Sequence, residues 1–393
     1  MKQAVIVAGV RTAVGKAPRG TLKDTRPDYL GKLVVEDVVK KLGPNFDKSL
    51  VDDVIIGCAF PEGVQGMQMG RMIAQYAGMP DSVCGITVNR YCSSGLQTIS
   101  MAAERIMVGA SEVIIAGGAE SMSMVASKQT PVPNMEILEG WPDLYLGMGL
   151  TAENVARQFS ISRQEQDVFA SDSYAKASIA LKNGVFNGEI TPVPYKVTSI
   201  GPDNKVVVQE KQFTVDEGPR EGVTAESLSK LKPAFTPFGV VTAGNSSQTS
   251  DGAAAVVVMS EEKAKELGLK PRLRYVSFAV AGCPAGVMGI GPAFAIPKAL
   301  KLAGLTLKEI GLIELNEAFA SQSIYVIREL GLNRDIINVN GGAIALGHPL
   351  GCTGSKLTVQ IMNEMERRQV RYGMVSMCIG GGMGAAGIFE LGS

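Results

Sequence analysis

The side chains best suited to chemistry near neutral pH are one histidine and two of the six cysteines in this chain of 393 residues. His348 is the single histidine, and it lies in the glycine-rich stretch 340–354. Imidazole is the usual general base because its unperturbed pKa is close to neutral, although many lone histidines are only hydrogen-bonded. Glycines let a backbone approach a neighbour closely, which favours a functional His348. The glycines around it are Gly341, Gly342, Gly347, Gly351 and Gly354.

Cys92 opens a predicted apolar helix and follows a predicted strand over 86–91. Unsatisfied N–H groups at a helix N-terminus favour thiolate over thiol, so Cys92 is either a nucleophile or a buried, inert cysteine. Cys378 ends an apolar run and precedes residues 379–382, whose backbone N–H groups could form an oxyanion hole. A tight hairpin is the alternative there. The inward face of the predicted helix holds Leu96, Ile99, Ala103, Ile106 and Met107.

Composition excludes several classes of function. Lysine and arginine together number 38, as do aspartate and glutamate, so no overall field attracts nucleic acid or an anionic membrane. No segment has the pattern of a membrane span or a signal peptide, and we expect a cytoplasmic protein. The six cysteines lack CxxC spacing, so we expect free thiols and no metal site. Residues 9–16 and 380–384 depart from the phosphate-loop and dinucleotide-binding spacings.

Short β-branched runs alternate with helical patterns, which is typical of the α/β class. The same rhythm occurs in an early and a late part of the chain, so the sequence looks duplicated. Strands are predicted over 4–7, 51–57, 113–118, 310–315, 336–339 and 374–379, with a helix over 28–42.

A more polar stretch at about 120–250 separates the two parts and is interpreted as an inserted subdomain. It holds a strong helix signal, because Ser162 and Glu165 form a capping box and three apolar residues follow at helical spacing. These residues are Val168, Ala175 and Ile179.

The division between the two parts is placed near residue 268. Gly268 suits the position after a helix that begins near Ser260, and Pro271 stops its continuation. This predicts an N-terminal domain over 1–268, which includes the inserted subdomain, and a C-terminal domain over 269–393.

Four separated motifs occur in an order known from one family. They are residues 89–97 (NRYCSSGLQ), 316–319 (NEAF), 347–349 (GHP) with glycine flanks, and 378–384 (CIGGGMG). From residue 4 to the C-terminus the chain resembles the thiolases, and among them the bacterial 3-ketoacyl-CoA thiolases (acetyl-CoA C-acyltransferases) of fatty-acid β-oxidation. The resemblance implies two βαβαβαββ halves that form a five-layer αβαβα arrangement, with an inserted loop subdomain.

The resemblance also implies roles for the motif residues. Cys92 would carry the acyl group and His348 would take its proton. Cys378 would protonate the departing acetyl-CoA enolate. A water held by Asn316 would face the enolate oxygen together with His348, while the N–H groups of Cys92 and Gly380 would face the tetrahedral oxyanion.

Coenzyme A would be a co-substrate, with no permanently bound cofactor. Arg220 would lie near its adenine or phosphate end, although surface arginines are usually only solvated. Glu317 would orient water or loops, or else serve as a buried hydrogen-bonded anchor. The pantetheine tunnel would be lined by Met148, Phe235, Ala243, Ser247 and Phe319.

The implied reaction is cleavage of a 3-ketoacyl-CoA into acetyl-CoA and an acyl-CoA two carbons shorter. Gly147 and Met148 stand where many biosynthetic thiolases have His-Met, which favours this reaction over acetoacetyl-CoA synthesis by an acetyl-CoA acetyltransferase. A ketoacyl synthase with a Cys-His-His site would need a second histidine. A non-catalytic acyl-CoA-binding relative would be expected to lose its reactive groups. The expected partners are acyl-CoA, coenzyme A and further copies of the chain, as a homodimer or homotetramer.

Overall fold

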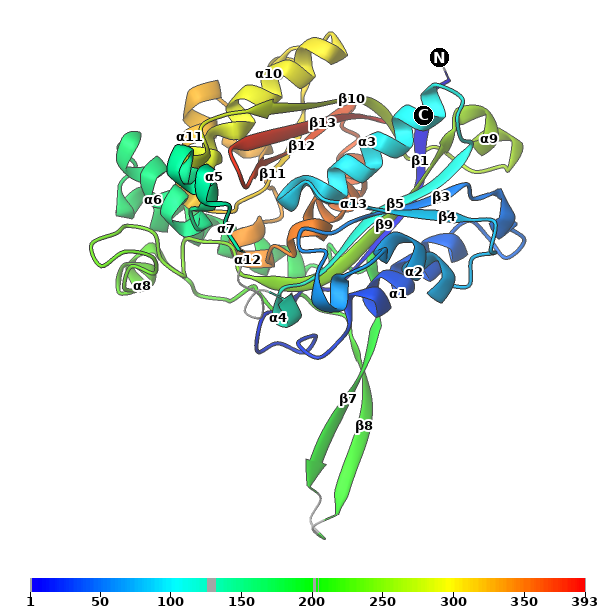
Figure 1. Cartoon of the computed structure of the whole chain (residues 1–393), viewed down its shortest axis with the longest axis horizontal. Helices are drawn as coiled ribbons and strands as arrows, with labels where there is room; N and C mark the ends of the chain where they lie inside the picture. The colour runs from blue at the N-terminus through cyan, green and yellow to red at the C-terminus, as the bar shows by residue number, and fades with distance from the viewer. Residues whose placement is uncertain (1, 126–131, 201–202, 204, 393) are drawn as a thin grey trace.

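The computed structural model describes residues 2–125, 132–200, 203 and 205–392. These residues place eleven strands in one mixed sheet, in the order β11-β12-β13-β10-β1-β9-β5-β3-β4, with β2 beside β9 and β6 beside β1. Strands β7 and β8 form a separate two-stranded arm that projects from the body (Figure 1).

The strands are β1 (Ala4–Thr12), β2 (Gly15–Lys16), β3 (Asp53–Gly57), β4 (Cys84–Val88), β5 (Val113–Ser121), β6 (Ile190–Thr191), β7 (Val193–Ile200), β8 (Val206–Phe213), β9 (Ser250–Ser260), β10 (Leu273–Gly282), β11 (Leu312–Leu315), β12 (Tyr372–Ile379) and β13 (Met383–Leu391). The α-helices are α1 (Pro27–Lys40), α2 (Met69–Tyr76), α3 (Ser94–Met107), α4 (Met122–Val125), α5 (Met135–Gly140), α6 (Met148–Gln158), α7 (Arg163–Lys182), α8 (Ala225–Ser229), α9 (Glu261–Glu266), α10 (Gly291–Ala303), α11 (Ala320–Leu330), α12 (Ala343–Leu346) and α13 (Leu350–Arg368).

The sheet is built from two similar halves. From the edge inward, the strand order of the N-terminal half is β4-β3-β5-β9-β1, and that of the C-terminal half is β11-β12-β13-β10. The four strands of the C-terminal half correspond in order to β3, β5, β9 and β1. The halves join where the first strand of each, β1 and β10, pair antiparallel at Val5↔Arg274 and Ile6↔Leu273. The predicted duplication is therefore confirmed.

Five layers follow from the two faces of the strands, because neighbouring residues of a strand point to opposite sides. On β3, Val54 and Ile56 pack in one core with α1 and α2, whereas Ile55 packs in another with α3 and α13. The cover of the C-terminal half is α10 and α11. Figure 1 shows α3 and α13 between the two halves of the sheet. The predicted α/β class and αβαβα arrangement are confirmed.

The strand predicted over 336–339 is wrong. Ile337 makes one isolated bridge to Ile313 on β11, and Asn338 then takes a positive φ of 44°. The side chain of Asn338 replaces a strand partner, because its amide accepts from Leu315 N at 2.9 Å and donates to Leu315 O at 2.8 Å. The short apolar run predicted a full strand. In the structure the side-chain amide of Asn338 makes the two hydrogen bonds to Leu315 that a strand backbone would otherwise make.

The inserted segment between β5 and β9 contains the predicted helix α7, and its capping box of Ser162 and Glu165 is present. The predicted apolar face is wrong, however. Val168 and Ile179 are exposed, at 46% and 61%, and Ala175 is exposed as well. The buried face is rotated by about one residue and holds Phe169, Ala170, Tyr174 and Ala177.

The boundary predicted near residue 268 lies between α9 and β10, where Gly268 has a φ of 67°; the domain division itself stays a prediction. Across the described ranges, no helix is long and apolar enough to cross a membrane.

Candidate active site

Cys92 lies in a strained turn between β4 and α3. Tyr91, the residue before it, has a positive φ of 43°, and a short 3-10 helix, Tyr91–Ser93, leads directly into α3. The turn is held by the hydroxyl of Ser94, which accepts from Arg90 N at 2.8 Å and donates to Tyr91 O at 2.7 Å. Cys92 is buried there, and α3 begins two residues later than the sequence predicted, at Ser94.

Cys378 and Gly380 lie at the hairpin that joins β12 to β13. Gly381 and Gly382 supply its turn with φ values of 82° and 85°. A Cβ added to Gly380 would lie 3.6 Å from the ring of Tyr91, the residue before Cys92. The backbone N–H of Gly380 lowers the pKa of the Cys92 thiol, and the fully buried Cys378 is close enough to Cys92 for its own pKa to be raised by it. The tight hairpin, one of the two alternatives that the sequence left open, is present, and the oxyanion hole formed by its N–H groups stays a prediction.

His348 lies between α12 and α13, and both of its ring nitrogens have partners. Its Nδ1 is 2.6 Å from Oγ1 of Thr353, and its Nε2 is 3.4 Å from Nδ2 of Asn316. Asn316 follows β11 and is fixed by its backbone N–H, which donates to Ser376 O at 2.9 Å. The sequence-predicted pair of His348 and Asn316 is thus brought together.

The glycines around His348 approach the other half of the chain. His348 and Cys92 each lie two residues before a central helix, α13 and α3 respectively. A Cβ added to Gly354 would lie 2.7 Å from Cβ of Leu96 on α3, and one added to Gly95 would lie 2.6 Å from Ser355 N on α13. The close approach predicted for this stretch therefore joins the N-terminal turns of the two central helices.

Burial keeps both proposed catalytic groups uncharged before substrate arrives. It raises the pKa of the Cys92 thiol to about 12, with the N–H groups of Gly380 and Cys92 opposing the shift. Burial, followed by the charge of Lys356, lowers the pKa of His348 to about 3. The helix N-terminus favours a thiolate at Cys92, as the sequence suggests, and burial acts in the opposite direction and raises the pKa of the thiol. A thiolate has to form as the thiol attacks.

Burial also raises the pKa of Cys378 well above its usual value, and the neighbouring Cys92 adds to the shift. Cys378 consequently holds its proton at neutral pH. Such a thiol has a proton to give to a carbanion, and its thiolate would be a strong base in the reverse direction.

Four of the residues predicted to line the pantetheine tunnel lie close to this centre. Met148 and Phe319 share one apolar cluster with Cys378, and the Phe235 ring stands edge-on to Phe319 at 6.0 Å. Ser247 donates its backbone N–H to Ala318 O at 2.9 Å, beside Phe319.

The remaining two predicted coenzyme contacts lie on exposed loops. Ala243 is exposed in the loop that carries Ser247. Arg220 is exposed after β8, where its carbonyl accepts from the Ser178 hydroxyl of α7 at 3.1 Å.

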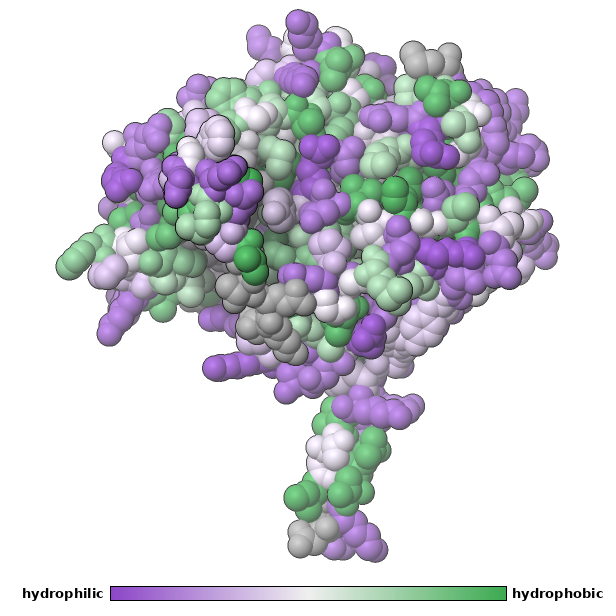
Figure 2. Space-filling model, viewed as in Figure 1, coloured by the Kyte–Doolittle hydropathy of each residue, from purple (hydrophilic) through white to green (hydrophobic). Residues whose placement is uncertain are grey.

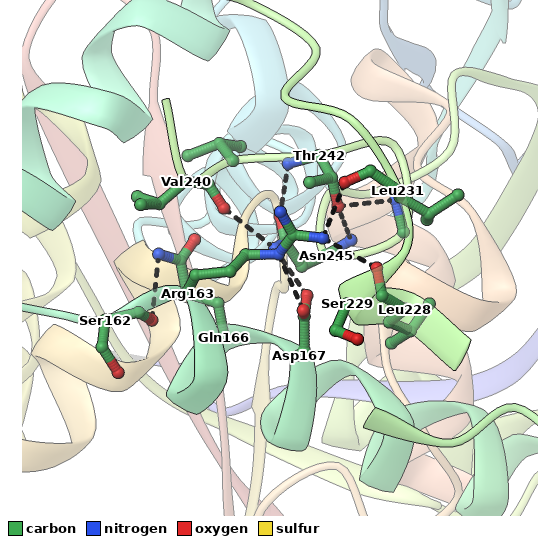
Figure 3. Close-up of polar contacts among 12 residues, drawn as sticks. Ser162, Arg163, Gln166, Asp167, Leu228, Ser229, Leu231, Val240, Thr242 and Asn245 are labelled. Atoms are coloured by element: carbon green, nitrogen blue, oxygen red, sulfur yellow. Dashed lines mark hydrogen bonds and ion pairs between the residues drawn. The ribbon is translucent and has the colours of Figure 1, made fainter. Parts of the chain in front are cut away.

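A buried polar network attaches this loop to α7 (Figure 3). Asn245 donates to Asp167 at 3.0 Å and accepts from Thr242 N at 2.7 Å. Arg163 bonds Asp167 at 2.7 Å and Leu228 O at 2.7 Å. The polar stripe of α7 therefore determines where the loop with Ala243 and Ser247 lies.

Glu317 is the buried anchor that the sequence left as one of two possibilities. It accepts from Ser173 at 2.6 Å, Asn338 at 2.8 Å and Ile344 N at 3.2 Å. Burial raises its pKa.

Two residues around the site were missed from the sequence. Thr353 bonds His348, and Glu120 accepts from Ala59 N and Gly351 N, both at 2.7 Å, which ties the loop after β3 to the start of α13. A Thr five residues after the histidine was the only signal for the first, and a lone Glu after an apolar strand was the only signal for the second.

The fold is that of an acyltransferase built from two duplicated halves, and the residues of the candidate site come together where these halves meet. The chain belongs to the thiolase family. Residues 4–262 match the family model "Thiolase, N-terminal domain" and residues 269–391 match "Thiolase, C-terminal domain".

Relatives and solved structures match over nearly the full length. The chain is 57% identical to a 3-ketoacyl-CoA thiolase of Bacillus subtilis, with 100% of both chains covered. It is 46% identical to the peroxisomal 3-ketoacyl-CoA thiolase 1 of Arabidopsis thaliana, covering 99% of this chain and 87% of that one. The structure of a Bacillus anthracis acetyl-CoA acetyltransferase superposes with a TM-score of 0.90 at 41% identity, covering 100% and 99% of the two chains. The dimeric peroxisomal thiolase of Saccharomyces cerevisiae also gives 0.90 at 41%, covering 99% and 97%.

Proposed function

We propose that the protein is an acetyl-CoA C-acyltransferase that cleaves 3-ketoacyl-CoA by thiolysis in fatty-acid β-oxidation. The observation that carries this proposal is that the end of β12 and its hairpin, with Cys378 and Gly380, pack against the turn that holds Cys92. One thiol for the acyl group, one for the carbanion and a donor for the oxyanion are what cleavage of a C2–C3 bond requires. The relatives named 3-ketoacyl-CoA thiolase support the same reaction.

In the first half-reaction the Cys92 sulfur attacks the 3-keto carbon while His348 takes the thiol proton. The N–H groups of Cys92 and Gly380 stabilise the tetrahedral oxyanion. The C2–C3 bond then breaks, the acyl group stays on Cys92, and the departing enolate receives its proton from Cys378. Asn316 supports the enolate oxygen through a bound water, because its Oδ1 is buried without a hydrogen-bond partner among the described residues.

In the second half-reaction the thiol of coenzyme A gives its proton to the Cys378 thiolate and attacks the acyl-Cys92 thioester. The sulfur of Cys92 leaves and takes back the proton held by His348, so all three groups return to their starting state. Coenzyme A is the co-substrate and no resident cofactor takes part. Its pantetheine lies along Met148, Phe235, Ala243, Ser247 and Phe319, with Arg220 toward the adenine or phosphate end.

A chain-length series of thiolysis rates tests this function. We expect turnover of C8 to C16 3-ketoacyl-CoA, loss of activity in Cys92→Ser, and retention of activity in Cys84→Ser, whose thiol is exposed on β4. Turnover confined to C4 would instead support a biosynthetic acetyl-CoA acetyltransferase, which the Bacillus anthracis structure represents. Binding of acyl-CoA without turnover would refute the enzyme assignment.

We also propose that the protein assembles into a homodimer or a dimer of dimers in the cytoplasm. Strand β4 is the last strand of the sheet, and its Ile86 is 37% exposed, so its edge can pair with a second copy. Figure 2 shows apolar side chains along the projecting arm, where Ile200 and Val206 are 73% and 69% exposed. Size-exclusion chromatography with light scattering measures the mass of the assembly. A monomer at micromolar concentration would refute the proposal.

A further inference from the structure

The hydrogen bonds around His348 determine which of its two nitrogens carries the proton. A neutral imidazole has one N–H and one free lone pair, and only the free nitrogen can accept a proton from a thiol. His348 is 4% exposed, so its protein partners, Thr353 at Nδ1 and Asn316 at Nε2, decide the tautomer.

At Nδ1, the proton has to come from the histidine. Thr353 has a single hydroxyl proton, and its Oγ1 donates that proton to Pro349 O at 2.9 Å, one turn earlier in α13. The Thr353 oxygen is then an acceptor for the ring nitrogen 2.6 Å away. A chain of donors results, from His348 Nδ1–H to Thr353 and from Thr353 to Pro349.

At Nε2, the partner is a donor. The amide NH2 group of Asn316 (Nδ2) faces this nitrogen at 3.4 Å, and an amide NH2 group can only donate. Nε2 must therefore present its lone pair, which agrees with the assignment made independently at Nδ1. We propose that Thr353 is a positioning residue that holds His348 as the Nδ1–H tautomer, so that Nε2 is unprotonated and its lone pair, which faces Asn316 at rest, can take the proton of Cys92.

The role of Nε2 rests on the proposed function, whereas the tautomer can be measured without activity. The chain has one histidine, so ¹⁵N-histidine labelling gives one imidazole, and its two nitrogen shifts report the tautomer directly. We expect a protonated Nδ1 and an unprotonated Nε2 in the unsubstituted protein at neutral pH. The reverse pattern would overturn the proposal, even if the protein is an active thiolase.

Substitution of Thr353 tests its part in this arrangement. Thr353→Val keeps the shape and removes the hydroxyl, so we expect Nε2–H to become populated and kcat to fall about 10²-fold, within the range that a general base contributes. The KM for acyl-CoA should change less than about threefold, because such a loss acts on the transition state. Thr353→Ser restores the hydroxyl and should restore both the native tautomer and kcat.

Thr358→Val is the matched control. Thr358 is as buried as Thr353 in α13. Its hydroxyl donates to the carbonyl four residues before it, Gly354 O, at 2.8 Å, just as the Thr353 hydroxyl donates to Pro349 O. Thr358 makes no hydrogen bond to His348. Equal losses of kcat in Thr353→Val and Thr358→Val would reduce Thr353 to a structural residue and refute the proposal. If Thr353→Val does not fold, the nitrogen shifts of the unsubstituted protein and of Thr353→Ser still test the proposal, because both should show Nδ1–H. Absence of thiolysis in the unsubstituted protein would refute the proposed function alone.

Discussion

Replacing Gly354 with alanine tests whether close packing of the two central helices positions the catalytic groups. The added Cβ would lie 2.7 Å from Cβ of Leu96 and would collide with the backbone N of Leu96 on α3. Carbon atoms in ordinary contact are about 3.5–4 Å apart, so α13 and α3 must separate by about 1 Å. His348 and Cys92, which precede these helices, would separate with them.

The expected cost falls mainly on activity. Overpacking a core costs about 1–3 kcal/mol, whereas alanine in place of glycine inside a helix stabilises by about 1 kcal/mol. The free energy of unfolding should therefore fall by only about 0–2 kcal/mol. A misplacement of reacting groups by about 1 Å can lower the rate about 10²-fold, and we expect a loss of kcat of that order.

Thiolysis kinetics and urea unfolding together measure the two effects. Gly95→Ala, whose Cβ would meet Ser355 N from the α3 side, should give the same loss of kcat. Gly188→Ala is the control, because its Cβ would enter open space at an ordinary φ. An unchanged kcat in Gly354→Ala, or an equal loss in Gly188→Ala, would refute the reasoning.

Three further predictions concern the thiols and the coenzyme loop. Because the pKa of Cys92 is raised to about 12, the rate of inactivation by iodoacetamide should rise about tenfold per pH unit from 7 to 9; a plateau below pH 8 would indicate a resting thiolate. Cys378→Ser should still form acyl-Cys92 from a reactive acyl donor but exchange the C2 proton of acetyl-CoA very slowly, and unimpaired exchange would remove Cys378 from its proposed role. Asn245→Asp would place a second carboxylate 3.0 Å from Asp167, so the KM for coenzyme A should rise about tenfold; an unchanged KM would show that the loop does not depend on this contact.

The motifs predicted which residues lie together at the candidate site, because each is a local pattern that the fold brings to one place; their catalytic roles stay predictions. Cys92 lies between a strand and a helix, and Cys378 lies near the end of a strand that runs into a turn; the sequence shows these elements directly. The same local signals could not predict the protonation states. A helix N-terminus is visible in the sequence and predicts a thiolate, whereas the burial that raises the pKa of Cys92 arises only when the C-terminal half covers it.

Apolar periodicity predicted the wrong buried face of α7, because polar side chains are part of the face that is buried. On α7 it selected Val168 and Ile179, which are exposed, because the stripe that faces the protein includes Asp167 and Ser173. These two residues bond the loop at Asn245 and the anchor Glu317. A pattern that counts only apolar residues cannot find a face that is buried through hydrogen bonds.

The duplication explains why the proposed active site needs both halves. An antiparallel pairing of the two first strands, β1 and β10, relates the halves as a two-fold axis relates the subunits of a dimer. Such a relation brings equivalent elements together, and the start of α3 therefore meets the start of α13. Cys92 and His348 occupy the same place in their respective halves, two residues before these helices. The proposed nucleophile thus comes from one half and the proposed base from the other, so a change that alters the packing between the halves should alter the distance between them.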